Sequence, residues 1–260
     1  MNDGELGFFD LANPLLEKIE NVILVDMPPV VRLAIWAIIG AIISMGVYRL
    51  VSPQEKIKIA GSDTRDLIRK LAAYDGDFDG LTILIKSAFY ASSRHFFIVL
   101  GPVVLASLPV LFLLSWLSYS YNVLVPAPGE QVTITVTPPT PGLTWSPTNS
   151  IESHSNSAWI IEWPAEPGEL TLKNSKGITI LSLPLPHAVD VLHKKSWWNV
   201  MFANPIGYLP ESLELDLVLI QLPDQQILNF GPPWIRGWEA TFFTVLILCS
   251  LLIKFIFRVR

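Results

Sequence analysis

Cysteine and charged residues are scarce in this chain of 260 residues. The single cysteine, Cys249, excludes an intrachain disulfide framework and a zinc cluster built on cysteines. Charged residues make up 16% of the chain, whereas roughly 25% is usual for a soluble domain. The net charge of −5 also argues against nucleic-acid binding, and we expect no recognition of nucleic-acid sequence.

Familiar catalytic motifs are also missing. The sequence has no glycine-rich phosphate loop and no HExxH, GxSxG or CxxC pattern. Among the four histidines, only His187 and His193, with Asp190, suggest a metal site, and a surface connector is the preferred interpretation. We therefore predict that the protein is not an enzyme and holds no cofactor or metal.

An acidic turn resembles the start of a calcium-binding loop. Asp75, Asp77, Asp79 and Gly80 match the first six positions of an EF-hand loop. The twelfth position needs a bidentate glutamate, but Lys86 stands there and would repel the metal. An acidic, solvated turn is the preferred interpretation.

Long apolar runs are what the chain has in abundance. Hydrophobic residues make up 51% of it, and its mean hydropathy is +0.45. The runs Val30–Val47, Phe96–Leu117 and Trp238–Phe257 each approach the roughly 20 residues that a helix needs to cross a bilayer. We predict transmembrane helices over residues 30–50, 96–118 and 238–257. The first is no signal peptide, because its upstream flank is long and acidic.

Lysine and arginine set the expected orientation. Residues 1–30 contain one base and six acids, residues 49–94 contain eight bases, and residues 118–237 contain five bases against ten acids. Because short cytoplasmic loops are rich in Lys and Arg, we expect the N-terminus outside and the loop and C-terminus in the cytoplasm. The predicted location is a prokaryotic plasma (inner) membrane.

Helical signals flank the first span. Asn13-Pro14 opens an amphipathic helix within the predicted extracytoplasmic segment 1–29, lying on the membrane or packed on the outer domain. Ser52-Pro53-Gln54-Glu55 is a capping box that predicts the start of a helix. We expect this helix to be interrupted or kinked near Gly61-Ser62 and to run on to about Tyr74. A second helix is expected from about Leu81, so residues 51–95 form a cytoplasmic helical hairpin.

The segment between the second and third spans changes to strand periodicity. We predict a small extracytoplasmic all-β domain, an Ig-like sandwich, over residues 119–190. A connector with a β-hairpin follows over residues 191–237, and residues 258–260 form a cytoplasmic tail. The aromatic pair Trp197-Trp198 and the run Pro232-Pro233-Trp234 are typical of membrane-surface contacts. The expected strands are Gln131–Thr137, Trp159–Trp163, Glu169–Lys173, Gly177–Leu183, Leu213–Leu222 and Gln226–Phe230.

This order of elements resembles the YidC/Oxa superfamily, in particular its three-span archaeal branch and the insertase subunit of the eukaryotic ER membrane complex. The resemblance covers about residues 28–120 and 232–258. It rests on Pro28-Pro29 before the first span, the hairpin opening at Ser52-Pro53-Gln54, and the prolines Pro102 and Pro109 in the second span. It implies an α-helical integral membrane protein that inserts or chaperones membrane proteins.

The resemblance further implies a polar groove that lowers the cost of moving short polar segments through the bilayer. The groove candidates in this chain are Ser44, Arg49, Ser107 and Ser250. Expected partners are the lipid bilayer, nascent membrane proteins and the ribosome. The chain departs from the family pattern because its arginines lie at the ends of the first span and its β-domain lies between the second and third spans. An accessory or scaffold subunit of a larger membrane complex, docked through the outer β-domain, is the alternative.

Overall fold

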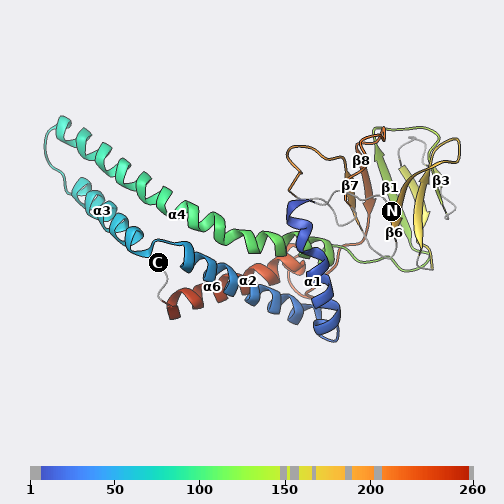
Figure 1. Ribbon diagram of the computed structural model, residues 1–260, viewed down its shortest axis with the longest axis horizontal. Helices are drawn as coiled ribbons and strands as arrows, with labels where there is room; N and C mark the ends of the chain where they lie inside the picture. Colours follow the sequence, from blue (N-terminus) through green and yellow to red (C-terminus); the bar gives the residue numbers. More distant parts are fainter. Residues whose placement is uncertain are drawn as a thin grey trace. The chain divides into compact units, whose positions relative to one another are not determined.

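The computed structural model describes residues 7–146, 151–152, 158–165, 168–184, 189–201 and 207–257. The protein is mostly helical, with three long apolar helices and two small antiparallel sheets (Figure 1). It folds as two compact units. One combines the chain up to Arg32 with Phe112–Thr241, and the other combines Leu33–Leu111 with Phe242–Arg260.

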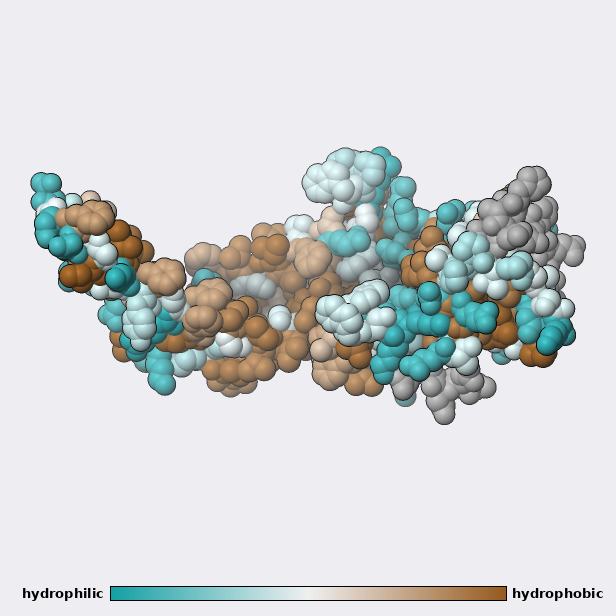
Figure 2. All heavy atoms as spheres, turned by 90° about the horizontal axis from the view of Figure 1, so that it is seen from above, coloured by the Kyte–Doolittle hydropathy of each residue, from teal (hydrophilic) through white to brown (hydrophobic). Residues whose placement is uncertain are grey.

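Three helices are long and apolar enough to cross a membrane: α2 (Pro29–Val51), α4 (Phe78–Tyr121) and α6 (Trp238–Phe257). Brown, apolar spheres dominate much of the helical surface in Figure 2. Exposed apolar side chains on this scale need lipid or protein to cover them. The three expected spans therefore correspond to real helices, and the protein has the helices of an integral membrane protein.

Helix α3 (Gln54–Ala72) lies beside the first part of α4, which runs in the opposite direction, and the two form the expected hairpin (Figure 1). The predicted interruption near Gly61-Ser62 is absent, because α3 is continuous. A Cβ on Gly61 would lie 3.6 Å from the ring of His95 on α4, an ordinary van der Waals distance, so Gly61 faces α4 without being required there. The predicted capping box is also wrong, since α3 begins after Pro53 without a side-chain cap.

The acidic turn between α3 and α4 contains a local hydrogen bond. The Tyr74 hydroxyl donates to Asp77 Oδ1 at 2.9 Å, and this bond raises the pKa of Tyr74. Helix α4 already begins at Phe78, three residues before the predicted start. No group of three or more metal-binding side chains occurs among the described residues, this turn included.

The N-terminal segment is helical, as expected. A 3-10 turn, η1 (Phe8–Ala12), leads into α1 (Asn13–Ile19), and a π-helical turn, η2 (Glu20–Leu24), follows. Phe9 packs on Phe112 of α4, with 5.2 Å between ring centroids. The segment is therefore anchored to the last part of α4.

The β region contains two antiparallel sheets. The five-stranded sheet has the order β3-β4-β1-β8-β7, and the three-stranded sheet has the order β2-β5-β6. A single hydrophobic cluster includes Ile134 and Trp159 from the first sheet and Leu170 and Leu172 from the second, so both sheets share one core. The strands are β1 (Gln131–Thr137), β2 (Thr144–Ser146), β3 (Ile151–Glu152), β4 (Ala158–Glu162), β5 (Glu169–Lys173), β6 (Thr179–Pro184), β7 (Val191–His193) and β8 (Leu217–Gln221).

The last strands differ from the expected connector. Strand β8 lies between β1 and β7 inside the five-stranded sheet, so β7 and β8 are part of the sheet, although they lie in the predicted connector. The predicted strand Gln226–Phe230 is absent. The backbone N–H groups of Ile227 and Leu228 instead donate to the carbonyl of Arg236, at the end of the short helix α5 (Pro233–Arg236). These contacts hold the chain just before α6.

Candidate functional site

All four groove candidates lie in the unit formed by Leu33–Leu111 and Phe242–Arg260. The Ser44 hydroxyl of α2 donates to the backbone carbonyl of Ala106 on α4. Gly40 and Ala41, one turn earlier on α2, are buried. Small residues permit close helix approach in membranes, and interhelical hydrogen bonds add to such contacts. Ser44 therefore joins α2 to α4.

The other three candidates have different surroundings. The Ser107 hydroxyl donates to the carbonyl of Val104 in its own helix at 2.8 Å. The Arg49 guanidinium lies over the ring of Phe257, 5.6 Å from its centroid, and so links α2 to the end of α6. Ser250 is half-buried on α6. Arg49 thus lies near the C-terminal end of α2, and Ser250 lies in the C-terminal half of α6.

Burial is uneven along these helices. Buried positions of α2 cluster between Leu33 and Ala41, and those of α4 in this unit include Pro102 and Ala106. In contrast, none of the residues in the ranges 42–51, 96–101 and 243–257 is buried. Buried positions of these helices are thus confined to one half of their length. Arg49 and Ser250 lie in the other half, and Ser44, at its border, still bonds to Ala106.

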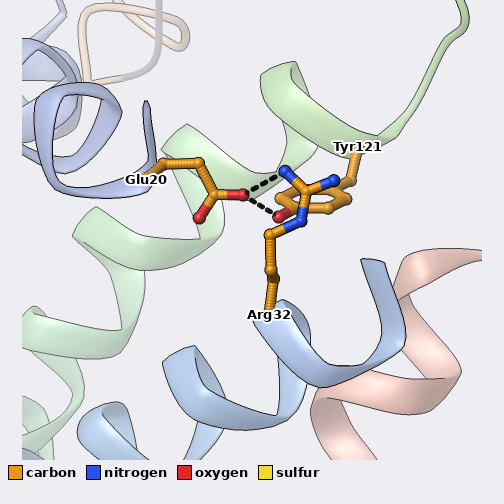
Figure 3. Close-up of polar contacts among 3 residues, drawn as sticks. All are labelled: Glu20, Arg32 and Tyr121. Atoms are coloured by element: carbon orange, nitrogen blue, oxygen red, sulfur yellow. Dashed lines mark hydrogen bonds and ion pairs between the residues drawn. The ribbon is translucent and has the colours of Figure 1, made fainter. Parts of the chain in front are cut away.

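A second polar site, in the other unit, was not predicted. Glu20 is only 6% exposed, and its Oε1 accepts hydrogen bonds from Arg32 Nη1 at 2.9 Å and from the Tyr121 hydroxyl (Figure 3). The Arg32 guanidinium also lies 5.8 Å from the centroid of the Tyr121 ring. The polar cluster Glu20–Arg32–Tyr121 therefore joins η2, the first turn of α2 and the last residue of α4.

A second buried carboxylate makes a parallel connection. Asp10 is 1% exposed, and its Oδ1 accepts a hydrogen bond from the Ser115 hydroxyl of α4. Buried carboxylates are strongly disfavoured unless they are hydrogen-bonded. Asp10 and Glu20 therefore fix the N-terminal segment on α4 at two points.

An open cleft of about 250 Å³ adjoins the polar cluster. Its lining combines the polar cluster with Glu17, Trp116 and Tyr119. Glu20 and Arg32 already pair with each other at its wall. The polar cluster therefore holds the N-terminal segment in place. The described residues that line the cleft include no nucleophile–base pair.

The weak metal candidate does not form a metal site in the part of the chain described. His193 Nδ1 lies 3.0 Å from Asn199 Nδ2, and Asp190 Oδ2 accepts a hydrogen bond from Asn122 at 3.2 Å. His187 lies outside the described residues. His193 and Asp190 thus each contact an asparagine side chain.

The fold and these contacts define a protein with three potential membrane-spanning helices and a separate two-sheet β region. Comparison with known proteins adds no family: no family model, curated protein or solved structure matches the chain.

Proposed function

We propose that the protein is a non-enzymatic insertase or chaperone for membrane proteins, of the YidC/Oxa type. One observation carries the proposal: α2 and α6 bury no residue over 42–51 and 243–257. A closed three-helix bundle would bury one side of each helix along its whole length. The half without buried residues offers apolar contact to a client helix while its own packing stays intact.

The charge of Arg49 supports this proposal. With the expected orientation, the half without buried residues adjoins the cytoplasm, and Arg49 and Ser250 line the route that a client segment takes. A positive charge beside a low-dielectric path attracts an acidic or polar client tail and offsets part of its desolvation. The apolar walls then release the client helix sideways into lipid.

The hairpin of α3 and the first part of α4 supports client capture. Phe78, Phe89 and Tyr90 are exposed on α4, and the hairpin is rich in lysine and arginine. Exposed aromatic groups beside bases fit a transient contact with an apolar nascent segment or with the ribosome. This contact would deliver clients to the helices.

A reconstituted insertion assay tests the proposal. Proteoliposomes with the full chain should insert a single-span reporter with a short acidic N-terminal tail, scored by protease protection of the tail. The double change Arg49→Leu with Ser250→Leu should lower insertion about fivefold, because about 1 kcal/mol of attraction for the tail is lost.

The matched control is Lys176→Leu, which removes an exposed base at the turn between β5 and β6. It should insert the reporter as the unchanged protein does. Equal insertion by empty liposomes and protein-containing liposomes would refute the proposal.

An accessory subunit of a larger membrane complex is the second candidate. The Ser44 hydroxyl favours it, because its bond to Ala106 occupies one of the polar groups expected to line a client path. Depletion of the protein, followed by a quantitative census of membrane proteins, separates the two functions. Broad loss of small membrane proteins supports insertion, and loss of a single complex supports the accessory role.

A further inference from the structure

Two exposed tryptophans project from a loop in the β region. Trp197 is 90% exposed and Trp198 is 63% exposed, and Val200 and Met201 next to them are exposed as well. We call residues 196–201 the tryptophan loop. Exposing this much indole surface to water is unfavourable. We therefore expect a lipid or protein surface to cover the loop.

The tryptophan loop is held in place by a buried asparagine. Asn199 is buried, and its Oδ1 accepts from the backbone N–H of Ser196 at 2.7 Å. Its Nδ2 donates to the carbonyl of Lys194 at 2.9 Å, and its own carbonyl accepts from the Tyr208 hydroxyl at 2.7 Å. These bonds preorganise the loop, so displaying both indoles needs no ordering on binding.

The loop is connected to the end of a membrane-spanning helix. The backbone N–H of Phe9 donates to the carbonyl of Met201 at 2.9 Å. Phe9 and Phe8 in turn pack on Phe112 of α4, with ring centroids 5.2 and 5.5 Å apart. Leu11 and Leu15 of the same N-terminal segment are also exposed. The loop and this segment are therefore joined at Phe9, and both present exposed apolar side chains.

We infer that the tryptophan loop and the exposed side of residues 8–15 insert into the headgroup region of the bilayer that α4 spans. Indole rings favour this region because one edge is apolar and the N–H can meet water or headgroups. Lys194, just before the loop, pairs with Asp216 at 3.5 Å, and the exposed Lys195 adds a base next to the loop. The β region then rests on the membrane at a fixed point, whatever the function of the helices.

Depth-dependent quenching in nanodiscs tests this inference. In full-length protein carrying Cys249→Ser, single cysteines would replace Trp197, Lys176 or Leu252 and carry an environment-sensitive fluorophore. The bilayer would contain phosphatidylcholine and phosphatidylglycerol, with nitroxide lipids labelled at a shallow or a deep position. Aqueous iodide would report exposure to water.

The label at Trp197→Cys should show blue-shifted emission, strong quenching by shallow nitroxide and protection from iodide. The label at Lys176→Cys should respond to iodide alone, and the label at Leu252→Cys should be quenched by deep nitroxide. The inference is overturned if position 197 behaves like position 176. It is also overturned if position 197 is shielded from iodide without lipid quenching, which would indicate a protein partner.

Loss of quenching at position 252 would overturn the membrane assignment and this inference together. The insertion assay of the proposed function is separate, because a protein that fails to insert clients still seats its tryptophan loop in lipid. Failure of one therefore does not imply failure of the other.

Discussion

Replacing Glu20 with alanine should cost about 3–5 kcal/mol of stability, because it strands a partly buried guanidinium without its carboxylate. Only 23% of the Arg32 side chain is exposed, and Glu20 Oε1 is its ion-pair partner at 2.9 Å. The Tyr121 hydroxyl loses its acceptor in the same variant. We expect the thermal unfolding midpoint in detergent to fall on the order of 10 °C.

Glu17→Ala is the matched control, because Glu17 lies three residues earlier and is half-buried. It should change the midpoint by a few degrees at most. Hydrogen exchange should speed up over residues 8–24 in Glu20→Ala and stay slow in Glu17→Ala. Equal midpoints for the two variants would show that the Glu20–Arg32–Tyr121 cluster does not hold the N-terminal segment.

A double variant distinguishes the effect of leaving Arg32 unpaired from the effect of removing the whole ion pair. Replacing both Glu20 and Arg32 with leucine removes the pair and leaves no uncompensated charge. Apolar replacement of buried ion pairs is often neutral or stabilising. The double variant should therefore recover most of the stability that Glu20→Ala loses, and failure to recover would contradict the electrostatic explanation.

The sequence predicts the helices and most strands because their signals are local. The alternation of Gln131–Thr137 predicts β1, and the structure confirms its bounds. The hairpin of β5 and β6 is likewise confirmed around Asn174, whose Oδ1 accepts from the N–H groups of Lys176 and Ile178. In each case the neighbouring residues determine the conformation.

The buried polar cluster could not be predicted from the same signals. Helical periodicity places Glu20 on a face of the N-terminal segment, but it does not show that its partner is Tyr121, 101 positions later. The one signal available was Arg32, a charge within the first turns of an apolar helix that needs a counter-charge. Six acidic residues precede Arg32, and the sequence alone does not indicate which of them is its partner.

Gly61 and β8 show where a local pattern is not sufficient. A glycine within a helix suggests a break, yet α3 continues through Gly61, because the cost of one glycine does not outweigh the rest of the helix. The alternation of Leu213–Leu222 predicts a strand but not its partner. Strand β8 pairs with β1, 80 to 88 positions earlier, instead of with the segment that follows it. Pairing depends on the shared core, which sequence periodicity does not reveal.

Replacing Trp159 with alanine should unfold the β region selectively, at a cost of about 3–5 kcal/mol. Trp159 is 1% exposed, lies opposite Ile134 in the five-stranded sheet and belongs to the core that both sheets share. Near-ultraviolet circular dichroism should lose the part of its aromatic signal that comes from the β region, while the far-ultraviolet signal of the long helices persists. The exposed neighbour Ile160, changed to alanine, is the control and should retain both signals.

The same variant distinguishes the two candidate functions. An insertase that acts through α2, α4 and α6 should keep most of its insertion activity in the Trp159→Ala protein, because Arg49 and Ser250 lie in the other compact unit. An accessory subunit docked through the β region should lose its complex in that variant, as seen by co-purification, while Ile160→Ala keeps it. Loss of insertion together with loss of the β region would mean that the sheets take part in client handling, which is contrary to an insertion path confined to the helices.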